Sequence, residues 1–261
     1  MIRATWTRTV YELRIFFRDR RSVFFTIVLP IMLLVIFGSI FGKTKLGHGV
    51  RFSQYFVAGM LASAILYSSF QQLAIMIPEE RSNGTLKRIK GSPLPPAAYF
   101  GGKFFATVVV YVVQATGLFI IGASSYHVQL PHGVGWLNFA WISLLGLLAS
   151  ALLGISFSSL ARDGRAASAL VSPVLLFLQF SSGVYMVFTT LPSWMQHVGA
   201  LFPLKWLAQS MRGVFLPASF AQHEPSHTFA FGDTALVLMA WVLIGAALCW
   251  RRFAWVPQEQ A

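Results

Sequence analysis

The chain of 261 residues is poor in charged side chains, above all in acidic ones, and in cysteine. Only 11% of its residues are charged and 56% are hydrophobic, whereas about 25% are charged in an average soluble domain. This composition excludes a disordered chain and argues against an ordinary soluble enzyme. The single cysteine, Cys249, cannot form an internal disulfide or a cysteine metal cluster, and we expect it to pack inertly. The class that remains is a polytopic membrane protein.

Long apolar runs are abundant, and six of them are long enough to form membrane-spanning helices. A helix needs about 20 apolar residues to cross the hydrocarbon core, and it pairs its backbone polar groups internally. The first run follows a charged leader and is longer than a signal-peptide core, so we expect it to be retained. We treat residues 1–261 as one transmembrane domain. Its predicted spans are about 22–42, 55–78, 104–124, 138–160, 166–189 and 233–250.

Lysine and arginine are distributed unevenly among the segments that connect these spans. The leader, the tail and the connections after the second and fourth spans hold 15 of the 20 basic residues, and the other connections hold 5. Because basic connections tend to stay in the cytoplasm, this bias places both termini there. Orientation in a membrane therefore explains the net charge of +12 better than nucleic-acid binding does.

The leader, residues 1–21, has the pattern of an amphipathic helix. Its apolar side chains recur every three or four positions, and its arginines lie largely off that face. We expect the helix to lie flat in the headgroup region of the membrane. A helix that binds a soluble partner is the alternative. The apolar positions are Ile2, Trp6, Val10, Leu13 and Phe17.

The predicted spans carry no acidic or basic residue deep inside them. Coupled carriers commonly use such residues, and no nucleophile-elbow, metalloprotease or phosphate-loop motif is evident. We therefore expect neither an enzyme nor a cofactor or metal site in this chain, and energy for uphill transport must come from another polypeptide. The histidines fall between the spans, and we interpret them as solvated residues; they are His48, His127, His132, His197, His223 and His227.

Polar and small residues recur at helical spacing inside several spans. The small residues Gly146, Ser150, Gly154 and Ser158 of the fourth span predict close helix packing. Polar stripes in the second and fifth spans can line a pathway for an amphipathic substrate or can form hydrogen bonds between helices. Both interpretations stay open. The candidate pathway residues are Ser63, Tyr67, Gln71, Gln179, Ser182 and Met186.

The most informative stretch follows the second span. Asn83-Gly84 breaks the chain, and Thr85–Lys90 can form a short helix before a proline-rich run. A short helix held between two spans is suited to carry motion from a cytoplasmic partner. A solvated basic loop is the alternative from the residues alone.

This stretch resembles the Glu-Arg-x-x-Gly-Thr-Leu-(basic)-x-x-x-x-Ser-Pro-Leu pattern of ABC-2 type transporter permeases. A second segment, with Leu191-Pro192-x-Trp194 and then Phe202-Pro203-Leu204, resembles that family's outer segment. With the leader, the six spans and the length, the resemblance covers essentially the whole chain. The nearest subgroup is that of bacterial drug and lipid exporters of the daunorubicin-resistance kind. The first match comprises Glu80, Arg81, Gly84, Thr85, Leu86, Lys87, Ser92, Pro93 and Leu94.

The resemblance implies an all-α, ABCG-like transmembrane domain in the bacterial cytoplasmic membrane. Its partners would be a second permease and separate ATPase subunits that bind ATP and Mg. An amphipathic drug or lipid would move outward, through a cavity lined by the second and fifth spans. Residues 79–103 would form the coupling loop, and residues 191–215 short helices in the outer leaflet. The implied ATPase-coupling residues are Glu79, Glu80, Arg81, Gly84, Thr85, Leu86, Lys87, Arg88, Ser92 and Pro93.

Two other functions remain as alternatives. An ATP-independent membrane carrier or enzyme is compatible with the polar stripes. A membrane scaffold that senses without transporting is compatible with the same spans.

Overall fold

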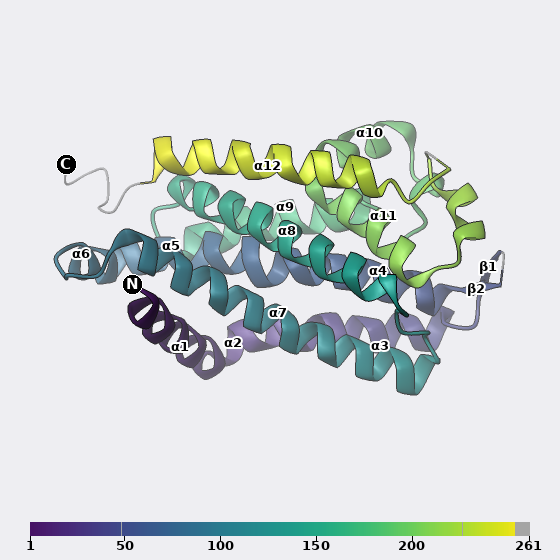
Figure 1. Cartoon of the computed structure of the whole chain (residues 1–261), viewed down its shortest axis with the longest axis horizontal. Helices are drawn as coiled ribbons and strands as arrows, with labels where there is room; N and C mark the ends of the chain where they lie inside the picture. The colour runs from purple at the N-terminus through teal and green to yellow at the C-terminus, as the bar shows by residue number, and fades with distance from the viewer. Residues whose placement is uncertain (48, 226, 254–261) are drawn as a thin grey trace.

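The computed structural model describes residues 1–47, 49–225 and 227–253, and most of them are helical (Figure 1). The helices are α1 (Ile2–Arg18), α2 (Arg20–Val23), α3 (Leu29–Phe41), α4 (Phe52–Ile65), α5 (Gln72–Ser82), α6 (Thr85–Lys90), α7 (Pro96–Tyr126), α8 (Val134–Phe157), α9 (Gly164–Ser181), α10 (Ser193–Leu201), α11 (Pro203–Phe215) and α12 (Phe231–Arg252). The π-helical turns η1 (Phe24–Val28) and η2 (Leu66–Gln71) join α2 to α3 and α4 to α5. Strands β1 (Lys45–Gly47) and β2 (Val50–Arg51) pair antiparallel, with Lys45 opposite Arg51.

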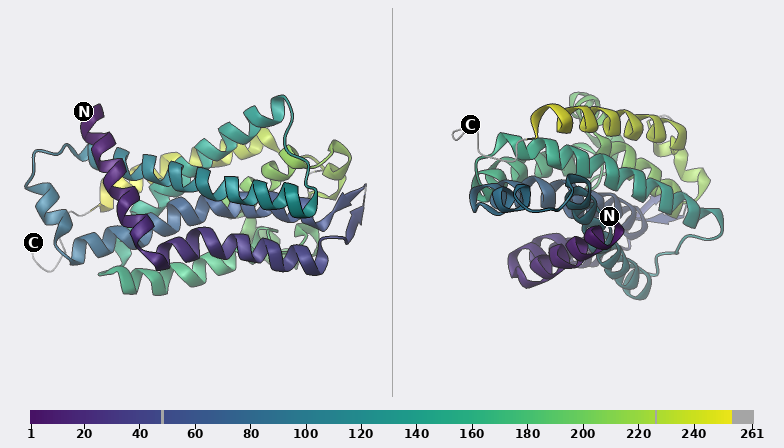
Figure 2. Two further views of the ribbon diagram at one scale, coloured as in Figure 1. Left: turned by 90° about the horizontal axis from the view of Figure 1, so that it is seen from below. Right: turned by 60° about the vertical axis from the view of Figure 1, so that its left-hand side comes forward.

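Six helices in the described residues are long and apolar enough to cross a membrane, which confirms the predicted number and the all-α class. They lie side by side along the longest axis, with α6 at one end and the β1–β2 hairpin at the other (Figure 1). We call these the α6 end and the hairpin end. Helix α1 crosses α7 obliquely at the α6 end (Figure 2). The spans are Arg20–Phe41, Phe52–Ser82, Pro96–Tyr126, Val134–Leu160, Gly164–Ser181 and Phe231–Arg251.

The second and third spans extend farther toward α6 than the sequence suggested. Helix α5 continues through Pro78 to Ser82, and α7 begins at Pro96 rather than at residue 104. Proline suits the first position of a helix, because the amide hydrogen that it lacks has no partner there. The non-helical stretches around α6 are therefore shorter than the expected loop 79–103, and α6 sits close to the ends of two long helices.

The fifth span ends earlier than predicted, at Ser181 rather than at residue 189. Gly183 has φ +72°, and a Cβ at this position would lie 2.7 Å from the Cβ of Phe188. A left-handed glycine just past the last turn ends a helix. The chain then forms the 3-10 turn Phe188–Thr190 and the short helices α10 and α11, which lie in the predicted outer segment.

The π-helical turn in the first span precedes a proline. The amide of Leu29 donates to the carbonyl of Phe24, five residues back, and Pro30 then contributes no amide hydrogen. In the fifth span, Pro173 lies inside α9, which remains an α-helix on both sides of it. The distortion next to Pro30 is thus a local widening of the helix.

The core of the bundle is built around the second span. In the most apolar 18-residue stretch of the second span 78% of the residues are buried, whereas in that of the last span only 17% are buried. Helix α12 therefore lies at the periphery. The small residues of α8 allow close approach: a Cβ on Gly146 would lie 2.7 Å from Leu207, and one on Gly154 would lie 2.7 Å from the carbonyl oxygen of Phe70. The close packing predicted for this stripe is confirmed.

Candidate functional site

The expected short helix is present as α6, over the same residues, and it lies at the outer tip of the bundle (Figure 1). Gly84, with φ +77°, precedes it, and the side-chain oxygen of Asn83 accepts the amide hydrogen of Thr85 at 3.0 Å. Leu86 is completely buried in an apolar cluster with Leu73 of α5 and Tyr99 of α7. Leu86, together with the half-buried Ile89 that packs against the same cluster, therefore fixes the helix to the bundle.

The opposite face of α6 is exposed and basic. Lys87 and Arg88 are exposed and lie on the sides of the helix away from Leu86, Lys90 is exposed one turn after Leu86, and the exposed Glu79 precedes the helix. Since α6 has only six residues, it cannot hold its own position by helix propensity. Its orientation depends on the packing of Leu86 and on the ends of α5 and α7.

A buried cluster of four charged side chains and one tyrosine joins α1, α5 and α7 beside α6. We call Arg8, Glu12, Glu80, Tyr99 and Lys103 the Glu80 cluster. The Glu80 carboxylate accepts hydrogen bonds from Arg8 at 2.8 Å, from Tyr99 at 2.6 Å and from Lys103 at 3.0 Å. Glu12 pairs with Arg8 and, at 3.1 Å, with Lys103. Two cations thus face two anions, and each anion contacts both cations.

Close backbone packing supports the Glu80 cluster. A Cβ on Gly102 of α7 would lie 2.5 Å from the side chain of Arg8, so glycine is needed where α1 crosses α7. Buried ions need opposite charges close by, because leaving water costs several kcal/mol per charge. The arrangement makes α1, α5 and α7 one mechanical unit at the α6 end.

Arg81 has a different role from the adjacent Glu80. Its guanidinium donates to the carbonyl of Ser158 at 2.9 Å and lies 3.5 Å from that of Ala161, at the end of α8. A cation there satisfies unpaired carbonyls and complements the negative end of the helix dipole. Arg81 thus ties α5 to α8.

The structure divides the coupling candidates into two groups. Glu80, Arg81 and Leu86 are buried and position α6, whereas the exposed residues can reach a partner. Gly84 and Thr85 are half-buried at the start of the helix. The exposed candidates are Glu79, Lys87, Arg88, Ser92 and Pro93.

Sequence reasoning missed four members of the Glu80 cluster, namely Arg8, Glu12, Tyr99 and Lys103. The signal for one of them was present: Glu12 is one of two acids in a leader with six arginines, one helical turn after Arg8. The apolar face of α1 has the expected exposure, with Ile2 88% and Trp6 65% exposed. The other side of α1 packs on the bundle through the buried Arg8, Thr9, Glu12 and Phe16, and its charges match those of Glu80 and Lys103.

The candidate pathway residues lie mainly between the second and fifth spans. The Ser63 hydroxyl donates to the side-chain oxygen of Gln179 at 2.6 Å, and Tyr67 interacts with Gln179 and Tyr185. The amide nitrogen of Gln179 and the hydroxyl of Ser182 are buried without a hydrogen-bond partner in the described part of the chain. Hydrogen bonding between helices accounts for Ser63, and two polar groups remain unpaired in the same region.

The remaining two pathway candidates lie farther apart. Gln71 is half-buried in η2, toward the α6 end, whereas Met186 is 49% exposed beyond the end of α9. The early end of α9 separates Met186 from the stripe, because residues after Gly183 no longer follow helical spacing.

A second buried ion pair lies at the hairpin end. Arg212 of α11 is fully buried and donates to Glu224 at 2.9 Å, to the carbonyl of Gly183 at 3.3 Å, and packs 4.8 Å from the ring centre of Tyr55. The Tyr55 hydroxyl donates to the same carbonyl at 2.9 Å. The pair therefore holds the turn after α9 against α4 and α11. Burial lowers the pKa of the neighbouring Lys205 to about 8.

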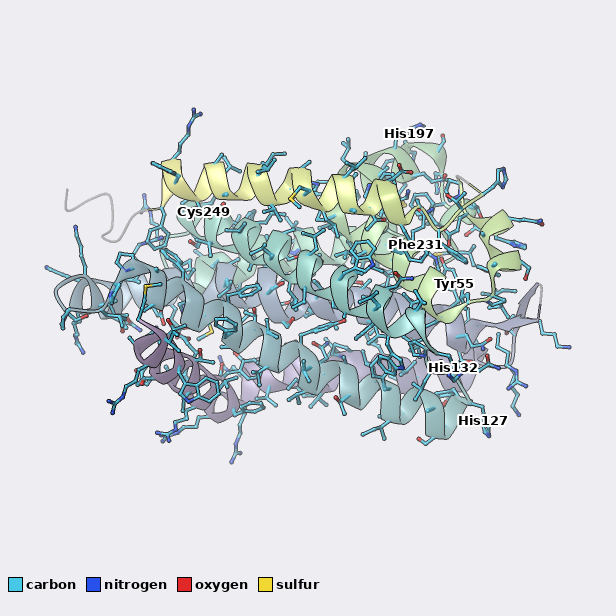
Figure 3. The ribbon with its side chains drawn as sticks, in the orientation of Figure 1. Tyr55, His127, His132, His197, Phe231 and Cys249 are labelled. Carbon is cyan, nitrogen blue, oxygen red and sulfur yellow. The ribbon has the colours of Figure 1, made fainter. Side chains whose placement is uncertain are left out.

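The structure places the labelled histidines His127, His132 and His197 toward the hairpin end, and Cys249 toward the other (Figure 3). No group of three histidine, cysteine or acidic residues that could hold a metal ion occurs within residues 1–47, 49–225 and 227–253. His48 lies outside the described residues. Cys249 is half-buried beside the Ser156 hydroxyl, at 3.2 Å.

The fold and these two clusters define a multi-pass membrane protein with a short helix exposed at one end. A family model described as ABC-2 type transporter matches residues 3–216, so the chain belongs to that family and is a membrane transport permease.

Named relatives are consistent with this family. The inner membrane transport permease YadH of Escherichia coli (strain K12) is 22% identical over 235 residues, 86% of each chain. YvfS of Bacillus subtilis (strain 168), which carries a transport-permease name, is 24% identical over 75% of this chain and 79% of its own. The similarly named ycf38 of Cyanophora paradoxa is 22% identical over 85% and 79%.

Proposed function

We propose that the chain is the membrane subunit of an ATP-driven exporter, and that α6 is where a separate ATPase subunit docks. The observation that carries the proposal is the exposed basic face of a six-residue helix whose other face is fixed by the buried Leu86. The family supports it, because ABC-2 permeases usually work with an ABC ATPase. The α6 end then faces the cytoplasm, in agreement with the distribution of basic residues.

Motion applied to α6 would reach the substrate pathway through rigid elements. Leu86 lies in one apolar cluster with Leu73 of α5 and Tyr99 of α7, and the Glu80 cluster joins those helices to α1. Helix α5 continues through η2 into α4, which carries Ser63 opposite Gln179 of α9. Closure of the ATPase subunits would thus be transmitted along the second span and open the contact between α4 and α9. ATP and Mg would be bound by the partner alone.

The substrate class follows from the lining of this contact. Ser63, Tyr67 and Gln179 offer hydrogen-bonding groups without charge, among apolar neighbours. Such a surface suits an amphipathic drug or lipid and disfavours a highly charged solute. We infer that a second permease completes the pathway in the bacterial cytoplasmic membrane and that transport runs outward.

Charge reversal on α6 tests the docking role. We expect Lys87→Glu with Arg88→Glu to reduce the amount of ATPase that copurifies roughly tenfold or more, because like charges at an interface cost several kcal/mol. Quantitative mass spectrometry of the purified complex measures this amount. The buried Leu86 is a poor test site, since Leu86→Asp would bury a charge and disturb the fold.

The matched control reverses two exposed arginines of α1 at the same end, Arg3→Glu with Arg14→Glu. This control changes the net charge equally and should retain the ATPase. Equal copurification by both double variants would contradict a docking role for α6.

A further inference from the structure

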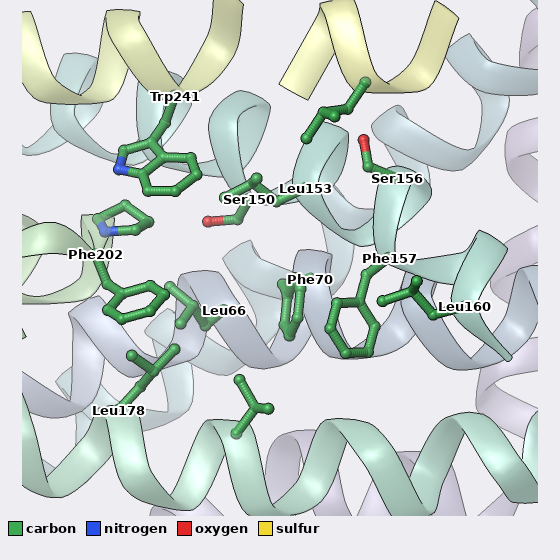
Figure 4. A pocket seen from close by; sticks show the side chains of 13 residues that line it. Leu66, Phe70, Ser150, Leu153, Ser156, Phe157, Leu160, Leu178, Phe202 and Trp241 are labelled. Carbon is green, nitrogen blue, oxygen red and sulfur yellow. The ribbon is translucent and has the colours of Figure 1, made fainter. Parts of the chain in front are cut away.

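A cavity of about 210 Å³ lies between η2, α8, α9 and α12 (Figure 4). It is far larger than the ~10–15 Å³ that a single water molecule needs. Helix α9 packs mainly on α5 and α12 mainly on α8, so the cavity lies in the gap between two helices that have different neighbours. Residues at its edge are accessible: Leu160 is 56% exposed, and Val174 and Leu248 are half-buried.

The wall of the cavity is almost entirely apolar. Of the thirteen lining residues only Ser150 and Ser156 are polar. At the hairpin side the rings of Phe202 and Trp241 stack with centres 6.4 Å apart and close the cavity, while Leu160 marks the α6 side. An apolar cavity of this size stays dry and takes hydrocarbon or aromatic ligands.

Ser150 is the feature that this environment does not explain. It is 1% exposed, and its hydroxyl has no hydrogen-bond partner among the described residues. The other serine, Ser156, is satisfied, because its hydroxyl donates to the carbonyl of Leu152 at 2.8 Å. Figure 4 shows the Ser150 oxygen directed into the space between α12 and α9. A buried hydroxyl without a partner costs about 1–3 kcal/mol, which a ligand with one polar group would recover.

We propose that this cavity binds a lipid-soluble molecule that is mostly hydrocarbon and carries one hydroxyl or carbonyl group, which pairs with Ser150. The molecule enters sideways from the bilayer, past Val174 and Leu248. Binding of such a molecule in the cavity is independent of the proposed function. Its assignment as the transported substrate rests on the proposed function.

The depth of Ser150 specifies where the polar group sits on the ligand. Ser150 lies ten residues before Leu160, roughly 15 Å along the helix, and Arg162, the first charge after α8, follows closely. Half of the hydrocarbon core is also roughly 15 Å thick. The hydroxyl therefore faces the middle of the bilayer, and the matching group is in mid-chain rather than at a lipid headgroup.

Photolabelling of the full-length chain in lipid nanodiscs tests the site. The probe is a diazirine-bearing methyl octadecanoate, and the competitors are methyl 12-hydroxyoctadecanoate and methyl octadecanoate. We expect labels on residues of the cavity wall such as Phe157 and Leu178. The hydroxylated ester should compete roughly two- to tenfold better than the plain one, as one neutral hydrogen bond predicts. Ser150→Ala should abolish this preference and leave the plain ester bound.

A filled cavity provides the matched comparison. Val174→Phe places a ring in the space and should remove the labels, whereas Leu176→Phe, on the same helix at a position 58% exposed, should leave them unchanged. Equal competition by both esters in the wild-type protein would overturn the proposal. Labels that persist in Val174→Phe would also overturn it.

Export by the assembled complex distinguishes a transported substrate from a resident bilayer lipid. If the cavity serves transport, Val174→Phe should lower ATP-dependent export of methyl 12-hydroxyoctadecanoate several-fold relative to Leu176→Phe. Lost labelling with unchanged export would identify a resident bilayer lipid and overturn the assignment to the substrate. Labelling needs no ATPase, so a failure of the docking proposal leaves the binding result intact and the two failures are distinguishable.

Discussion

Replacement of Glu80 by glutamine should destabilise the protein by about 3–5 kcal/mol, the range for removing one partner of a buried charge network. Arg8 and Lys103 would remain buried with Glu12 as their only nearby anion in the Glu80 cluster. At roughly 2–4 °C per kcal/mol, the apparent Tm in detergent should fall by about 6–20 °C. Tryptophan fluorescence during heating measures this change.

Two further variants make the Glu80 prediction specific. Adding Lys103→Met to Glu80→Gln leaves one cation facing one anion, and we expect this pair of changes to recover part of the lost stability. Glu79→Gln changes the exposed neighbour and should shift the apparent Tm little. If Glu80→Gln behaved like Glu79→Gln, the Glu80 cluster would not hold α1, α5 and α7 together. Trypsin should also cut α1 faster in Glu80→Gln, at Arg14 and Arg18.

Replacement of Arg212 by methionine should cost a similar amount, about 3–5 kcal/mol. Glu224, only 3% exposed, would lose its cation, and the carbonyl of Gly183 would lose one donor. The turn after α9 would then depend on Tyr55 alone among these contacts. Unfolding in denaturant, followed by tryptophan fluorescence, measures the change in the free energy of unfolding.

The control for Arg212→Met is Arg51→Met, which removes an exposed arginine at the same end. Combining Arg212→Met with Glu224→Gln removes the orphaned charge and should restore part of the stability. A loss that was equal in Arg212→Met and Arg51→Met would show that the buried pair contributes nothing beyond surface charge.

The local features of the fold could be predicted from the sequence because each has a local cause. Apolar runs identified the spans, and Asn83-Gly84 with the following prolines delimited α6. The misplaced end of the fifth span also had a local signal, because Ser182-Gly183 is a typical helix end. The prediction placed the end later because the apolar run continues beyond Gly183, and the length of that run was given more weight than the glycine.

The contacts of the Glu80 cluster could not be predicted in the same way. Arg8, Glu80 and Lys103 are far apart in the chain, and they meet only because Gly102 lets α1 cross α7 closely. Each charge alone was compatible with a solvated position outside the membrane. The burial of Glu80 and Arg81 changes their expected role: they position α6, and the exposed basic residues next to them are available to a partner.

Buried and exposed residues around α6 have separate roles. We expect damage to the Glu80 cluster to lower stability and loosen α1, whereas damage to Lys87 and Arg88 removes the partner and leaves the fold intact. The two outcomes are separable, because one is measured on the isolated chain and the other on the complex.

Purification of the tagged chain from its native membrane in mild detergent, with mass spectrometry of what copurifies, shows whether an ATPase docks on α6. We expect a soluble ATPase with a phosphate loop in stoichiometric amount, lost on Lys87→Glu with Arg88→Glu and kept on Arg3→Glu with Arg14→Glu. Recovery of the wild-type chain without any ATPase, under conditions that preserve other transporter complexes, would contradict this expectation.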